Sequence, residues 1–127
     1  MEKEKYTLEY IFRASPKMIY ERISTASGLS EWFADDVNIK GSTYAFIWDG
    51  QEQIAEILSK KDNQYIKFHW VDDEDENAYF EFRIVVDELT EDVALVITDF
   101  AEDEDEKEEN SDLWEAQVED LHQVLGY

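Results

Sequence analysis

Polar and apolar residues alternate along six consecutive segments between residues 35 and 100, and this period of two limits the possible folds more than any other feature. The segments span 35–41, 42–50, 51–62, 63–73, 77–88 and 91–100. Residues that favour tight turns separate several of them, as at Asp49-Gly50 and Asp62-Asn63. Consecutive strands joined by short turns pair with their neighbours in opposite directions. We therefore expect an antiparallel meander.

The N-terminal part of the chain predicts one more strand and two short helices. Residues 5–13 alternate and place a row of aromatic and aliphatic side chains on one face. Ser15 followed by Pro16 is typical of a helix start, because Ser caps the free amides and Pro suits the first helical position. We expect a second cap at Ser27 and a brief helix after it. The apolar stripe of that second helix consists of Leu29, Trp32 and Phe33.

The C-terminal residues predict the best-defined helix of the chain. Ser111 is placed to cap this helix and Gly126 to end it. The preceding run, residues 102–110, contains no apolar residue and is expected to be a solvated connection. The apolar stripe of the helix must be buried, and the long sheet is the only large surface available. The stripe consists of Trp114, Val118, Leu121 and Leu125.

Together these elements predict a single α+β domain over residues 1–127. Its order is β-α-α-β-β-β-β-β-β-α, with a curved seven-stranded antiparallel sheet wrapped around the C-terminal helix. A chain of 127 residues is large enough for one sizeable core.

The net charge of the chain limits the classes of molecule that we expect it to bind. Thirty-three acidic residues against eleven basic ones give a net charge of −22. This surface repels phosphate backbones and anionic membranes, so we expect no nucleic-acid or membrane partner. It can attract a basic protein partner at long range, and the like charge favours a monomer. An N-terminus without a signal-like apolar core and the lack of any apolar run of ~18 residues predict a cytoplasmic protein.

The residue types that carry most enzyme chemistry are sparse, and no catalytic residues are predicted. The chain has no cysteine, and of its two histidines His69 is expected on the solvent face of a strand and His122 beside the apolar stripe of the last helix. Arg83 alternates out of an apolar row, beside Glu81, and is expected in an external cross-strand ion pair. Asp99 is expected as a surface residue at a strand end, with a place at the mouth of a pocket as the alternative.

A calcium site and a cofactor site are not predicted. Asp73, Asp75 and Asn77 match the first ligands of a calcium loop. Ala78 stands where that loop needs Gly, and Ile84 where it needs Glu, so the motif fails. No nucleotide-binding or zinc motif is present, and we expect neither metal nor cofactor.

Aromatic rows along the strands leave two interpretations open. In one, the rings fill a close-packed core. In the other, they form the walls of a ligand pocket between sheet and C-terminal helix. The candidate lining residues are Trp32, Phe33, Phe46, Trp48, Phe68, Trp70, Phe80, Phe82, Trp114, Val118 and Leu121.

Motifs at both ends of the chain carry a family resemblance. The segment YIFRASPKMIYERISTASGLSEWFADDV contains Ser15-Pro16, Ser27-Gly28-Leu29 and Trp32-Phe33, and the C-terminal segment is SDLWEAQVEDLHQVLGY. Both resemble START-like proteins of the SRPBCC (helix-grip) superfamily, in the bacterial branch similar to the heat-shock-chaperone ATPase activators. The resemblance implies a helix-grip fold.

It also implies a pocket between sheet and helix, which in relatives receives lipids, sterols, polyketides or other apolar molecules. Our leading hypothesis is noncatalytic binding of a small apolar ligand, lipid-like or aromatic. The alternatives are an acidic protein-interaction module of the chaperone-activator type and a cyclase- or hydrolase-like enzyme. Fold alone does not choose among them.

Overall fold

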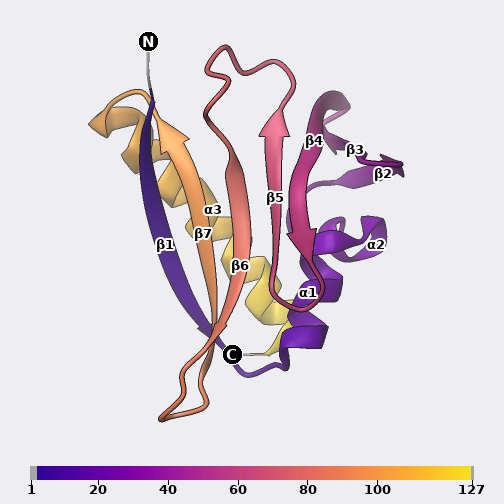
Figure 1. Cartoon of the computed structure of the whole chain (residues 1–127). Coiled ribbons are helices and arrows are strands. Elements are labelled where there is room, and N and C mark those ends of the chain that lie inside the picture. Colours follow the sequence, from indigo (N-terminus) through magenta and orange to yellow (C-terminus); the bar gives the residue numbers. More distant parts are fainter. Residues whose placement is uncertain (1–2, 127) are drawn as a thin grey trace.

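The computed structural model describes residues 3–126, and its elements follow the predicted order (Figure 1). Met1, Glu2 and Tyr127, which the predicted domain range includes, lie outside the described residues. The elements are β1 (Glu4–Phe12), α1 (Pro16–Ser24), α2 (Ala26–Leu29), β2 (Asp36–Lys40), β3 (Thr43–Trp48), β4 (Gln51–Lys61), β5 (Tyr65–Trp70), β6 (Phe80–Val86), β7 (Val93–Ala101) and α3 (Glu104–Leu125).

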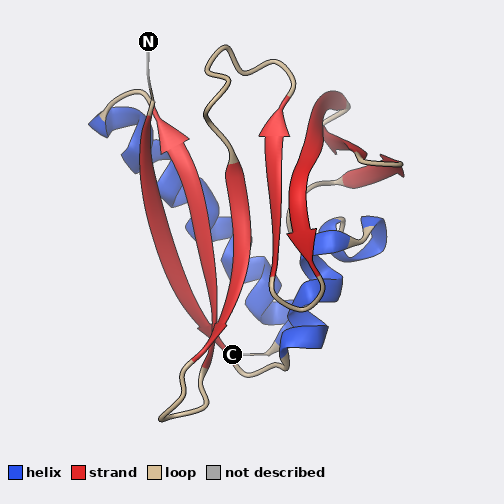
Figure 2. Ribbon diagram, in the orientation of Figure 1, coloured by secondary structure: helices blue, strands red, loops and turns tan. Residues whose placement is uncertain are grey.

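The strands form one curved, seven-stranded antiparallel sheet in the order β1-β7-β6-β5-β4-β3-β2. Strands β2 to β7 are the predicted meander, and β1 adds to its far end by pairing with β7, where Leu8 lies opposite Ile97. Helix α3 crosses one face of the sheet diagonally (Figure 2). The predicted helix-grip arrangement is confirmed. Within residues 3–126, no helix is long and apolar enough to cross a membrane.

The start of α1 is confirmed, and the predicted cap of α2 is wrong. The Ser15 side chain accepts a hydrogen bond from the Met18 amide at 3.2 Å, as the motif predicts. Thr25, not Ser27, caps α2, because its Oγ1 accepts from the Gly28 amide at 3.0 Å. The reason is that α1 ends at Ser24, so the one extended residue between the two helices serves both ends. A Cβ at Gly28 would overlap backbone atoms of α1, so only glycine allows this close approach.

Helix α3 begins two turns earlier than the sequence predicts. It runs over 22 residues from Glu104, and the Asp103 side chain caps it by accepting from the Glu106 amide at 2.8 Å. The acidic run is therefore mostly helix and not a connection. Its first-turn carboxylates lie at the positive end of the helix dipole, which stabilises them there. Polar side chains alone form these first turns of the helix, so the absence of an apolar residue did not mark a loop.

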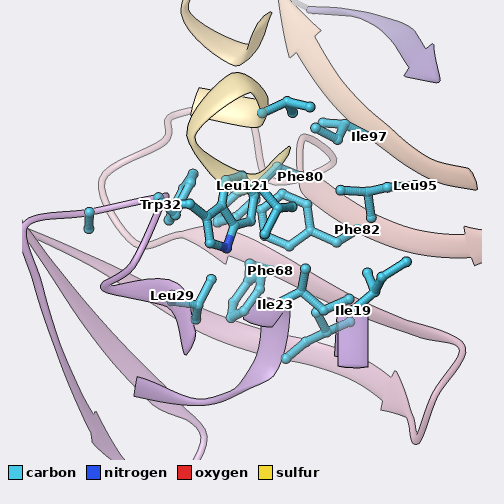
Figure 3. Packing of buried hydrophobic residues seen from close by; sticks show 14 of the residues in the cluster. Ile19, Ile23, Leu29, Trp32, Phe68, Phe80, Phe82, Leu95, Ile97 and Leu121 are labelled. Carbon is cyan, nitrogen blue, oxygen red and sulfur yellow. The ribbon is translucent and has the colours of Figure 1, made fainter. Parts of the chain in front are cut away.

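The core lies between the middle of the sheet and the C-terminal half of α3. Figure 3 shows side chains of the central strands, α1 and α3 pointing toward one another across this space. Phe82, from the sheet, and Leu121, from α3, have no exposed surface, and Ile19 and Ile23 of α1 close the same cluster from the side. This end of the sheet–helix interface is close-packed.

Candidate functional site

A cleft of about 610 Å³ opens between the sheet and the stretch of α3 from Glu106 to Asp120. It adjoins the close-packed core and shares Phe33 and Trp114 with it. Its apolar wall combines rings from the sheet, from α3 and from the segment after α2. The apolar and aromatic lining residues are Phe33, Trp48, Trp70, Ala78, Tyr79, Phe100, Leu113, Trp114 and Ala116.

The structure divides the predicted lining residues between the cleft, an adjoining hollow and the core. Phe33, Trp48, Trp70 and Trp114 line the cleft. Trp32 lines a second hollow, of about 410 Å³, which shares Phe33 and Trp48 with the first. The remaining predicted residues are almost completely buried in the core: Phe46, Phe68, Phe80, Phe82, Val118 and Leu121. Some of the rings therefore border open space, and others fill the core.

The rings of the cleft hold one another in place. Phe33 is stacked on Trp114, with centroids 5.5 Å apart and an angle of 15° between the planes. Trp48 meets the same phenyl ring edge-on at 5.2 Å and approaches Trp70 at 6.1 Å. Such offset and edge-to-face contacts are favourable aromatic geometries.

Hydrogen bonds fix the polar edges of these rings. The indole Nε1 of Trp48 donates to the carbonyl oxygen of Phe33 at 2.7 Å, and the Gln117 amide donates to the same oxygen at 2.9 Å. The indole Nε1 of Trp114 donates to Asp99 Oδ2 at 2.9 Å. Because the indole donors of Trp48 and Trp114 are satisfied, this part of the wall has a defined shape without a ligand.

Asp99 lines the cleft beside Trp114, so its predicted place on the open surface is wrong. The strand continues past it to Ala101, and β1 pairs with it through Tyr6, so position 99 keeps the inward direction of Leu95 and Ile97. Burial raises the pKa of Asp99, and hydrogen bonds from the Trp114 indole, the Phe100 amide and the Tyr6 hydroxyl oppose that rise.

Tyr6 and Asp99 form a fixed polar pair. The Tyr6 hydroxyl donates to Asp99 Oδ2 at 3.1 Å. Burial and the neighbouring Asp99 charge raise the pKa of Tyr6, so the phenol stays protonated and remains a donor. Both oxygens of the carboxyl group thus accept hydrogen bonds from the protein, an arrangement that gives the wall a polar, acidic point at a fixed position.

The acidic loop between β5 and β6 borders the cleft and binds the N-terminal segment. Lys3 Nζ pairs with Asp73 Oδ2 at 3.1 Å, and the Lys3 amide donates to Asp75 Oδ2 at 3.0 Å. Asp75 also accepts from the Asn77 amide, and these backbone hydrogen bonds lower its pKa. Among residues 3–126, no three His, Asp or Glu side chains are grouped as metal ligands. The contact with Lys3 could not be predicted, because its partners lie about seventy residues away along the chain.

The histidines and Arg83 lie outside the cleft lining. His69 Nδ1 is 2.8 Å from the Ala78 carbonyl oxygen, where it holds the end of the acidic loop. His122 stacks on Phe12, with centroids 4.1 Å apart. The predicted cross-strand ion pair of Arg83 is wrong. Its ion-pair partner is Glu81 of the same strand, with Arg83 Nε 2.9 Å from Glu81 Oε1. The two side chains can meet because residues two apart on a strand share a face.

Comparison with known proteins identifies the family. A model of the START-like superfamily domain matches residues 1–127. A Bacteroides fragilis protein with a solution NMR structure is 40% identical, with a TM-score of 0.69 and coverage of 100% of this chain and 94% of that one. The comparison with curated proteins finds no match.

Two further solved structures support the fold. The Aha1 dimer from Colwellia psychrerythraea has a TM-score of 0.81 at 19% identity and covers 96% of each chain. CalU16 from Micromonospora echinospora has a TM-score of 0.75 at 14% identity and covers 98% of this chain and 78% of that one. The motifs at both ends, the helix-grip architecture and the match over the full length agree: the chain belongs to the START-like superfamily.

Proposed function

We propose that the protein binds a small, largely apolar ligand in the cleft between α3 and the sheet. The observation that supports this proposal most strongly is the cleft itself, about 610 Å³ with a wall of aromatic rings. Ligand sites are commonly of ~300–1,000 Å³, mostly apolar, with a few fixed polar groups. The START-like fold often serves to bind hydrophobic molecules, and this cleft has the same setting between sheet and last helix.

The fixed wall favours binding for an energetic reason. Placing an apolar surface against Trp48, Trp70 and Trp114 removes it from water, at roughly 25 cal/mol per Å². The indole hydrogen bonds of Trp48 and Trp114 already order the rings, so less side-chain freedom is lost when a ligand binds.

Titration with N-phenyl-1-naphthylamine, a neutral apolar dye that fluoresces in apolar surroundings, tests this proposal. We expect saturable binding to the wild-type protein with one strong site. Ala116, on the exposed face of α3, lines the cleft, and Ala116→Phe would fill part of its volume. We expect this variant to weaken dye binding at least tenfold.

Glu119→Phe is the matched control. It adds the same ring to an exposed position of α3 outside the cleft lining, and we expect it to leave the affinity for the dye unchanged. Absence of saturable dye binding, or equal affinities of the Ala116→Phe and wild-type proteins, would contradict the proposal.

A second candidate function is an acidic protein-interaction module. It is supported by the net charge of −22 and by Glu104 and Asp105, which are exposed at the start of α3. Such a surface speeds the association of a basic partner at low salt. If this function is correct, a retained partner is lost from immobilised protein as salt rises from 50 to 500 mM; a partner list unaffected by salt would rule it out.

A further inference from the structure

The ionisable groups that line the cleft are mostly acidic. Lys3 is the basic side chain among the described lining residues, and Asp73 already pairs with it at 3.1 Å. None of the ion pairs within residues 3–126 involves the other acidic lining residues. Those residues are Asp99, Glu106 and Asp120. The cleft thus has an excess of negative charge of its own, in addition to that of the whole chain.

These carboxyl groups surround the apolar wall on different sides. Asp99 comes from β7, at the inner wall next to Trp114. Glu106 and Asp120 come from α3, fourteen residues apart, near opposite ends of the stretch that lines the cleft. A ligand lying against the rings therefore has one carboxyl group at the inner wall and two more along α3.

The aromatic rings also attract positively charged groups. The faces of indole and phenyl rings are negative, and they attract ammonium groups, above all quaternary ones, within ~6 Å of the ring. Trp48 and Trp70 are half-buried, and part of their surface lines the cleft. A carboxylate or phosphate group on the ligand would be repelled by the negative ring faces and by the carboxylates that have no ion-pair partner.

We propose that the cleft selects amphiphilic cations, meaning ligands with an apolar body and an alkylammonium group, over anions with the same apolar body. The inference rests on the proposed function, because it assigns the ligand class of the same cleft. The apolar body packs on the rings, and the ammonium group lies near Asp99 and the acids of α3.

Displacement of bound N-phenyl-1-naphthylamine by three ligands with one tail tests the inference. Decyltrimethylammonium, decanol and decanoate are compared at pH 7 and 150 mM NaCl, below the concentrations at which micelles form. We expect the cation to bind at least tenfold more tightly than the anion, with the alcohol between them.

Charge variants locate the selectivity. Asp120→Asn and Glu106→Gln each keep the side-chain shape and remove one charge from the cleft. We expect each to lower the preference for the cation over the anion severalfold while the affinity for decanol stays unchanged. Glu119→Gln removes the same charge from α3 outside the cleft lining and should leave the preference as it is.

The outcomes separate the inference from the proposed function. If decanol displaces the dye and decanoate binds as tightly as the cation, the inference is overturned and the apolar site stands. Equal effects of Glu119→Gln and the two cleft variants would also overturn it, because selectivity would then come from net charge alone. If the dye itself does not bind, both proposals fail.

Discussion

At the residue scale, Asp99 and Asp87 show how position changes the chemistry of one residue type. Asp99 is largely withdrawn from water beside Trp114, and burial raises its pKa. Asp87 begins the turn between β6 and β7, where its carboxylate accepts hydrogen bonds from the amides of Thr90 and Leu89, and these bonds lower its pKa. The sequence alone shows two aspartates near opposite ends of β7 and gives no sign of this difference.

The first prediction is that these two carboxyl groups titrate on opposite sides of the ordinary aspartate value of about 3.9. Carboxyl-carbon NMR across the acidic range measures both midpoints. The stability that Asp99 contributes is full below the unfolded-state pKa and is lost as pH rises through its raised folded-state pKa. The contribution of Asp87 is present above the unfolded-state pKa and is lost as pH falls through its lowered one. An Asp99 midpoint below that of Asp87 would refute this assignment.

At the element scale, the strands were predictable and the start of α3 was not. A period of two follows directly from burying one face of a strand, so alternation located β1 to β7. The first turns of α3 contain no apolar side chain and leave no such pattern, so the prediction of a connection at residues 104–110 was wrong. A signal existed in Asp103 followed three residues later by Glu106, a pattern typical of a helix start. In the structure the Asp103 side chain accepts from the Glu106 amide, and the Glu106 carboxylate accepts from the amide of Glu102, one residue before the cap.

The cleft could be predicted only as a list of rings. Whether rings leave space depends on the sum of their volumes in three dimensions, which residue type does not give. One usable signal was position along the strand. Trp48 and Trp70 are each the last residue of a strand and line the cleft, whereas Phe46 and Phe68, two residues earlier, are buried. At the ends of β3 and β5 the cleft, and not the packed core, lies next to the sheet.

The second prediction concerns the helix start. Asp103→Ala should lower the free energy of unfolding by about 1 kcal/mol, the usual cost of losing an N-cap, and Asp103→Asn should restore it because Asn also caps. Urea unfolding followed by circular dichroism measures both. If the helix instead began at Ser111, Ser111→Ala would be the costly change and Asp103→Ala would have no effect.

At the scale of the whole molecule, the net charge opposes the compact state. The ion pairs among residues 3–126 engage only Lys3, Arg22 and Arg83 on the basic side, so most acidic side chains face others of the same sign. Self-repulsion of this kind destabilises a folded chain and is screened by salt over about 8–10 Å.

The third prediction is that the melting temperature rises with ionic strength. Between 20 and 500 mM NaCl we expect an increase of several degrees, since 1 kcal/mol corresponds to roughly 4 °C for a domain of this size. Scanning calorimetry measures the effect, and KCl should reproduce it if screening is the cause. A fall in melting temperature with salt would show that attractive ion pairs dominate.

The pairing of β1 with β7 has a consequence for how the protein is made. Strand β1 leaves the ribosome first, yet its neighbour in the sheet is the last strand to be synthesised, and Leu8 finds its partner only when Ile97 has emerged. At about 5–20 residues per second, that interval is on the order of ten seconds. During this time β1, with its apolar row, has no partner strand to pair with. While it is being made, this domain is therefore most exposed to aggregation at β1, and its sheet closes only after β7 has emerged.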